Sequence, residues 1–127
     1  MRRSIELIAL LGAALLLALP AQAWTVVLYA RADVAQAERV RRLAALADQV
    51  VIDRELRAGT PWRQAMAEAI VGARLVLVVW SRRSAASPEV GAEWRMAAAA
   101  GVPIVAVLLD DAPLPPELGS RQAVDWR

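Results

Sequence analysis

The chain has 127 residues with 15 basic against 13 acidic, which is enough for one ordinary domain at a formal charge of only +2. It contains no Cys, no His and no Lys, because every basic residue is Arg. These absences exclude disulfides, thiolate or imidazole metal sites, Ser-His-Asp or Cys-His catalysis, and any phosphate-binding loop that requires lysine. No basic run exceeds two residues and no aromatics are interleaved among the arginines, so nothing indicates a nucleic-acid partner.

The first 23 residues have the pattern of a targeting or anchoring segment. Arg2 and Arg3 are followed by an uninterrupted apolar run at residues 7–19, then by Pro20 and a small-residue triplet at 21–23. This order is typical of a secretory signal peptide, and the run is short for a membrane span. Residues 1–23 are therefore predicted to be a signal peptide or an N-terminal apolar anchor. The protein would then be exported or membrane-anchored, touching a membrane only through this segment; a misassigned start would instead make it cytoplasmic.

From residue 24 onward, short apolar runs alternate with amphipathic stretches. The apolar runs predict strands at residues 25–29, 50–52, 75–80, 102–109 and 122–126. Helical spacing of apolar residues predicts helices at residues 34–47, 61–71 and 88–100. Asp33 is expected to cap the first of these helices, and Gly101 to end the last one at its C′ position. Residues 110–120 are rich in Pro and Gly and are predicted to form a loop.

Apolar strands that alternate with helices are typical of a parallel sheet covered on both faces. Right-handed crossovers then give a doubly wound three-layer sandwich, in which functional residues lie beyond the carboxyl ends of the strands. That edge is expected to carry the loops at residues 30–33, 53–61, 81–87 and 110–120. No glycine-rich dinucleotide-binding turn follows the first strand.

Four segments carry recognisable motifs in a fixed order. They are TVVLYARAD at 25–33, VVIDRELRAGTPW at 50–62, ARLVLVVWSRRSAASPEVGAEW at 73–94 and VPIVAVLLDDAPLPPELGSRQAVDWR at 102–127. Together they resemble the TIR (Toll/interleukin-1 receptor) domain, particularly its bacterial members. The resemblance implies an α/β, flavodoxin-like three-layer sandwich with a five-stranded parallel sheet over residues 24–127. The helix that usually follows the fifth strand is missing, which would leave a sheet face for a partner or the retained N-terminal segment to cover.

The resemblance implies two kinds of activity. A subset of TIR domains cleaves NAD+ at the nicotinamide–ribose bond, and this chain is predicted to be such an NAD+ glycohydrolase, with NAD+ as its substrate and no cofactor or metal. Many other TIR domains assemble with TIR domains as signalling scaffolds. The alternative is therefore a non-catalytic interaction module whose partners are other TIR domains, further copies of this chain included. A third reading is another flavodoxin-like binding domain with an accidental likeness.

Cleavage of the nicotinamide–ribose bond is compatible with the missing His and Cys. Nicotinamide leaves as a neutral pyridine, so the step needs no general acid, and a single carboxylate stabilises the developing oxocarbenium ion. Glu93 matches the catalytic Glu of the NAD-cleaving members; the alternative is a solvated Glu near a helix N-terminus. Glu89 stands one helical turn earlier, where the family usually has Trp, and adds a second carboxylate.

Other substrate-binding residues are assigned by the same resemblance. Tyr29 and Arg31 match the Tyr and Arg of the first loop, which line the nicotinamide and phosphate side of the site. Trp62 matches an aromatic position that can stack on the substrate; the alternative is a hydrophobic anchor of its helix.

Two further pairs of residues complete the expected site. Ser81 and Ser84 follow the third strand, where hydroxyls could contact phosphate; the alternative for each is a turn or helix cap. Asp53 and Gly59 frame the BB loop, which in the family often carries TIR–TIR contacts.

Overall fold

A five-stranded, entirely parallel sheet forms the centre of the computed structural model, which describes residues 24–52 and 62–127. Its strand order is β2-β1-β3-β4-β5, and each neighbouring pair runs parallel. The strands are β1 (Trp24–Leu28), β2 (Gln49–Ile52), β3 (Leu75–Trp80), β4 (Ile104–Leu108) and β5 (Gln122–Asp125). The predicted α/β class and the five parallel strands are confirmed.

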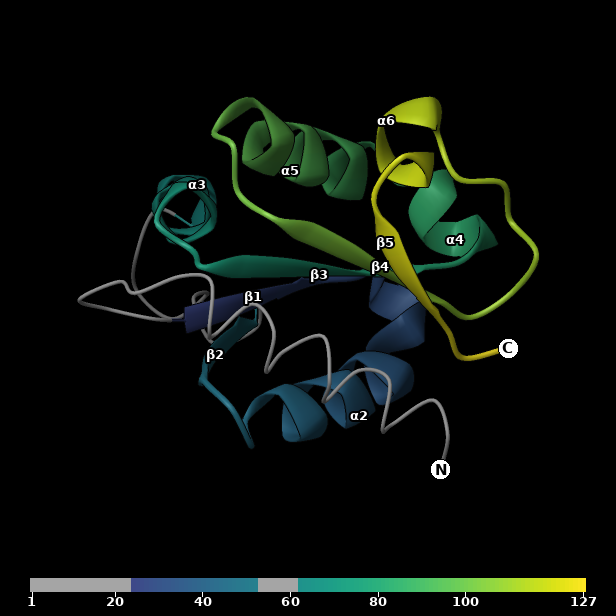
Figure 1. Ribbon diagram of the computed structural model, residues 1–127, viewed down its shortest axis with the longest axis horizontal. Helices are drawn as coiled ribbons and strands as arrows, with labels where there is room; N and C mark the ends of the chain where they lie inside the picture. Colours follow the sequence, from purple (N-terminus) through teal and green to yellow (C-terminus); the bar gives the residue numbers. More distant parts are fainter. Residues whose placement is uncertain (1–23, 53–61) are drawn as a thin grey trace.

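Helices cover both faces of this sheet. They are η1 (Arg31–Asp33), α2 (Val34–Ala44), α3 (Trp62–Val71), α4 (Arg82–Ala85), α5 (Pro88–Ala99) and α6 (Pro116–Gly119). Figure 1 shows α2 below the sheet, with α3, α5 and the two short helices α4 and α6 above it. The three-layer sandwich is therefore present. Of the residues described, none beyond β5 is helical.

The central strand β3 shows how the sequence produces these layers. All six of its side chains are buried, and their direction alternates along the strand. Val76, Val78 and Trp80 belong to the core under α3 and α5, whereas Leu75, Leu77 and Val79 belong to the core over α2. An uninterrupted apolar run is thus required, because neither face of this strand meets water.

The helix ends confirm one predicted cap and correct another. Gly101 follows α5 with φ +74°, the left-handed conformation that glycine adopts without a Cβ clash. At the other end of α5, the Ser87 hydroxyl accepts a hydrogen bond from the Val90 amide at 3.2 Å. The prediction that Asp33 caps α2 is wrong, because its side chain makes no capping bond to that helix. Its carboxylate instead lies against Ser81 and Arg83.

Three short helical segments were not expected from the sequence: η1, in the predicted loop at 30–33, and two single α-helical turns. Helix α4 lies in the predicted loop at 81–87, and α6 lies in the predicted loop at 110–120. Each has four residues, barely one turn, so neither is long enough to show a helical repeat of apolar residues. Elsewhere the predicted elements are present: the strand at 75–80 has the predicted bounds, and the ends of the others differ by at most three residues.

Some expectations concern other parts of the chain. The predicted signal or anchor segment at 1–23 and the BB-loop residues Asp53 and Gly59 lie outside the described residues. Within residues 24–52 and 62–127, no helix is both long and apolar enough to cross a membrane.

Candidate functional site

The strand order changes direction between β1 and β3, which lie side by side at the middle of the sheet. In a sheet of this order, ligands bind beyond the carboxyl ends of the strands at that point. Tyr29 and Arg31 follow β1 there, and Ser81 follows β3. The loops at 30–33, 81–87 and 110–120 lie at this edge as predicted, since β1, β3 and β4 all run the same way.

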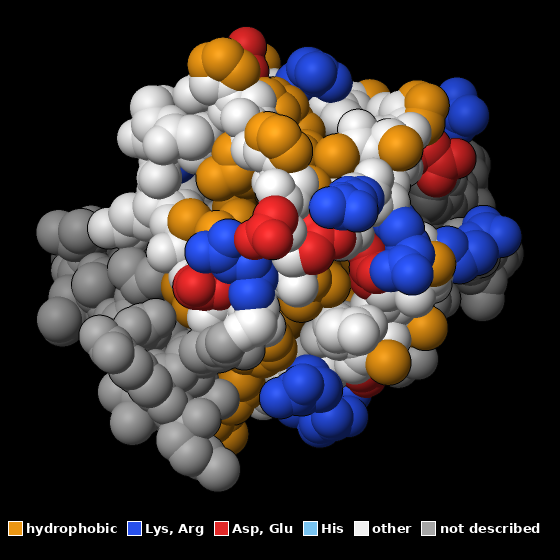
Figure 2. Space-filling model, turned by 90° about the vertical axis from the view of Figure 1, so that its right-hand side faces the viewer, with side chains coloured by type: hydrophobic (Ala, Val, Ile, Leu, Met, Phe, Trp, Pro, Cys, Tyr) orange, Lys and Arg blue, Asp and Glu red, His pale blue; other side chains and the backbone are white. Residues whose placement is uncertain are grey.

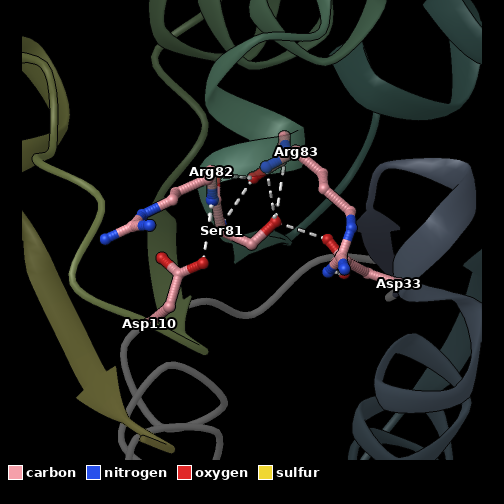
Figure 3. Close-up of polar contacts among 6 residues, drawn as sticks. Asp33, Ser81, Arg82, Arg83 and Asp110 are labelled. Carbon is pink, nitrogen blue, oxygen red and sulfur yellow. Dashed lines mark hydrogen bonds and ion pairs between the residues drawn. The ribbon is translucent and has the colours of Figure 1, made fainter.

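Four residues at this edge form a polar group that we call the rim cluster: Asp33, Ser81, Arg83 and Asp110 (Figure 3). The Ser81 hydroxyl donates to one oxygen of Asp33, and the Arg83 guanidinium donates to the other at 3.1 Å. Asp33 and Ser81 are each 1% exposed, whereas the Arg83 side chain is 65% exposed. The buried carboxylate is thus fully bonded and joins the end of β1 to the end of β3.

Ser81 and Ser84 together cap the short helix α4. The Ser81 hydroxyl accepts from the amides of Arg83 and Ser84, each at 3.2 Å. In return, the Ser84 hydroxyl accepts from the Ser81 amide at 2.7 Å, completing a capping box. Both hydroxyls are therefore engaged within the protein. Ser84 also borders a cavity of about 280 Å³, whose walls include Trp80, Trp94 and Arg95.

Asp110 ties the end of β4 to the same helix. Its two carboxylate oxygens accept from the amides of Arg82 at 3.0 Å and Ala112 at 2.9 Å. These backbone hydrogen bonds, that of Arg82 first, hold the pKa of Asp110 below its ordinary value of 3.8. Figure 2 shows this end of the molecule, where arginine and acidic side chains lie next to one another. The carboxylates of the rim cluster are thus hydrogen-bonded to side chains and backbone amides of the protein itself.

A separate cavity of about 320 Å³ opens between helices α3 and α5. Both helices lie above the sheet in Figure 1. Its walls are Arg63, Met66, Ala67 and Ile70 from α3, with Pro88, Glu89, Ala92, Glu93 and Met96 from α5. Most of these side chains are apolar. Of its charged residues, Glu93 is half-buried, whereas Glu89 and Arg63 are exposed. We call this space the α3–α5 cavity.

The predicted site residues are not gathered around one space. Glu93 borders the α3–α5 cavity, but Tyr29, Arg31, Ser81 and Ser84 are absent from its described walls. Tyr29 is half-buried and packs against the core on the α2 side of the sheet. Arg31 is exposed in η1, and Trp62 is the first residue of α3.

Arg63 and the apolar residues of the cavity were not singled out from the sequence. The signal that could have found them is helical spacing. The α3 residues are at positions 63, 66, 67 and 70, and four of the α5 residues are at 89, 92, 93 and 96. Each set follows the i, i+3, i+4, i+7 pattern of a single helix face, so two such faces opposite each other enclose the space. Among the described residues, no group of three or more acidic side chains could hold a metal ion.

The sheet order and the three layers define a flavodoxin-like α/β domain. The chain belongs to the TIR domain family, since the family model described as "TIR domain" matches residues 26–127. Among solved structures, the chain is similar to the TIR domain of the Toll-related receptor TRR-2 from Hydra magnipapillata. That similarity has 17% sequence identity and a TM-score of 0.70, over 80% of this chain and 82% of the other. None of the curated proteins matches this chain.

Proposed function

We propose that this TIR domain cleaves NAD+ at the nicotinamide–ribose bond, with Glu93 as the catalytic carboxylate. The observation that carries the proposal is the place of Glu93, half-buried in the wall of the α3–α5 cavity. A carboxylate beside apolar walls acts in a medium of lower effective dielectric than water, where its effect on a nearby positive charge is stronger.

The reaction needs no other catalytic side chain to protonate the leaving group. As the bond between ribose C1′ and the pyridinium nitrogen breaks, its electron pair returns to the ring and neutral nicotinamide leaves. Positive charge then develops on C1′ and its ring oxygen, facing the Glu93 carboxylate. A water oxygen bonds to C1′ and its proton passes to solvent, which gives ADP-ribose. Because no group needs to protonate the leaving group, the lack of His and Cys is no obstacle.

Arg63 provides the cationic side chain among the described walls of this cavity. Its planar guanidinium can donate two parallel hydrogen bonds to a phosphate, which suits the pyrophosphate of NAD+. In this proposal Arg63 binds the substrate at the cavity. The roles assigned by resemblance to Tyr29, Arg31 and Trp62 stay predictions.

The test is nicotinamide release by the full chain incubated with NAD+ at high protein concentration. The Glu93→Gln variant keeps the side-chain shape but removes the charge, so we expect the rate to fall by about 100-fold or more. Glu68→Gln is the matched control, because Glu68 is an exposed acid on α3 that is absent from the cavity walls, and it should keep the rate. Equal rates in all three proteins, or no release by any of them, would refute the enzyme proposal.

A non-catalytic TIR–TIR interaction module is the second candidate. The observation in its favour is that the hydroxyls of Ser81 and Ser84 are used in capping, and that Tyr29 packs on the opposite face of the sheet from Glu93. This candidate predicts concentration-dependent assembly of the full chain, measured by sedimentation, that Glu93→Gln leaves unchanged. A chain that stays monomeric across the concentrations tested would argue against it.

A further inference from the structure

We infer that Glu89 makes the α3–α5 cavity selective for a flat organic cation over a neutral ring of the same shape. The inference deepens the proposed function and rests on it, because the pyridinium ring of NAD+ is such a cation. It assigns Glu89 a separate role from Glu93: Glu89 determines which ring enters, whereas Glu93 stabilises the charge that forms at the bond.

The geometry places two carboxylates side by side on one wall. Glu89 and Glu93 are four residues apart on α5 and both border the cavity. Residues with this spacing are neighbours on a helix surface, roughly 5–6 Å apart at their Cβ atoms. Arg63 on α3 borders the same cavity. Two acidic side chains and one basic side chain therefore line a space whose described walls are otherwise apolar.

The depths of the two acids differ. Glu93 is half-buried, whereas Glu89 is exposed and lies in the first turn of α5. The positive end of the helix dipole favours a carboxylate in that turn. Glu89 is consequently the more accessible of the two carboxylates to a ligand that arrives from solvent.

A cation and a neutral ring experience this cavity differently. Both would contact the accessible apolar side chains of Ala67, Ala92 and Met96, and thioether sulfurs also pack favourably against aromatic rings. Only the cation carries a charge that the acidic side chains of this wall, the exposed Glu89 above all, attract. The apolar contacts therefore bind either ring, and the acidic pair discriminates by charge.

The experiment compares two probes that share one ring on the full chain: the 1-methylnicotinamide cation, which differs by its charge and one methyl group, and neutral nicotinamide. Titrations followed by NMR give an affinity for each, and the change in their ratio between wild type and variant measures the preference for charge. We expect the wild type to bind the cation more tightly. Glu89→Gln should lower the ratio by about three- to tenfold while the affinity for nicotinamide stays the same.

Two further variants complete the design. Arg63→Gln removes the basic side chain from the cavity and should raise the ratio. Glu68→Gln removes one acid from the outer part of α3, so it controls for overall charge and should leave the ratio unchanged. Higher salt should reduce the preference in the wild type, because the contribution of an exposed carboxylate is screened.

The outcomes separate this inference from the enzyme proposal. A ratio near one in the wild type, no binding of either probe, or an equal loss of both probes in Glu89→Gln would overturn the inference even if NAD+ is cleaved. A charge preference that Glu89→Gln removes would support it even if no nicotinamide is released. In that second case only the catalytic assignment of Glu93 fails.

Discussion

The rim cluster and the α3–α5 cavity both bring carboxylates together with arginine, but they use them in opposite ways. In the rim cluster, the oxygens of Asp33 and Asp110 accept hydrogen bonds from Ser81, Arg83 and backbone amides, so they hold the ends of β1, β3 and β4 together. In the cavity, charged side chains border an open space with apolar walls. The rim cluster thus holds strand ends together, whereas the α3–α5 cavity leaves charged side chains beside an open space.

The largest expected effect is on the rate of nicotinamide release, when the charge of Glu93 in the cavity is removed. If the cavity is a functional site, Glu93→Gln lowers the rate of nicotinamide release by about 100-fold or more. The free energy of unfolding should change less than in an Asp33→Asn variant, because Glu93 is half-buried at the cavity whereas Asp33 is 1% exposed. A variant that loses stability and activity together would instead place Glu93 among the structural residues.

Asp33→Asn should lower the stability of the fold and leave ligand binding unchanged, the reverse of the result expected for Glu93→Gln. The amide cannot accept hydrogen bonds from both Ser81 and Arg83 as the buried carboxylate does, so we expect the free energy of unfolding to fall by about 2 kcal/mol. Urea denaturation measures this change, and the ligand affinity of the folded protein should be retained. The control is Asp111→Asn, whose ion pair with Arg127 is exposed and should contribute less than about 0.5 kcal/mol. Equal losses in the two variants would contradict the structural role of the cluster.

Ser81→Ala tests the cap of α4 and should cost about 1 kcal/mol, since two amides lose their acceptor and Asp33 loses a donor. Ser120→Ala provides the comparison, because its exposed hydroxyl bonds only the Glu117 carbonyl at 3.4 Å. Thermal unfolding of both variants gives the difference. A Ser81→Ala protein as stable as Ser120→Ala would show that the capping box contributes nothing measurable.

Asp110 should give the smallest effect, and one that depends on pH. Its pKa is lowered in the folded protein, so its contribution is present above the unfolded pKa and is lost as pH falls below about 3.8. Asp110→Asn should therefore reduce stability by less than about 1 kcal/mol at neutral pH, because the group is partly exposed. The difference between wild type and variant should shrink as the solution is acidified from pH 5 to pH 3. A stability difference that stays constant over this pH range would show that the ionised Asp110 carboxylate is not its cause.

The sequence was sufficient to predict the architecture because the central strands β1, β3 and β4 are apolar on both faces. The run Leu75–Trp80 is buried throughout, so its pattern leaves no other place for it than the middle of a covered sheet. Helix α5 was equally predictable, since Ser87, Pro88 and Gly101 mark its ends. Helices α4 and α6 were missed because one turn is stabilised by local hydrogen bonds and carries no periodic pattern.

The candidate site was less predictable than the fold. The resemblance to the TIR family grouped Tyr29, Ser81 and Ser84 with Glu93, but none of the three borders the cavity that Glu93 borders. Tyr29 lies on the α2 side of the sheet. The Ser81 hydroxyl donates a hydrogen bond to the carboxylate of Asp33, which is 48 residues earlier in the chain. Neither fact follows from local spacing. Arg63, by contrast, was not predicted from the sequence but borders the same cavity as Glu93, because α3 packs against α5.

The burial of β3 has a consequence for the unfolded chain. Its six residues, LVLVVW, combine high β-propensity with no charge, which is the composition of a segment that aggregates when exposed. Arg74 stands directly before this strand, and Arg82 and Arg83 stand two and three residues after it. Charges in these flanking positions act as gatekeepers that oppose strand stacking between unfolded molecules. In the folded domain Arg74 pairs with Asp48 and Arg83 pairs with Asp33, so the arginines that stabilise the two ends of β3 also oppose aggregation of the unfolded chain.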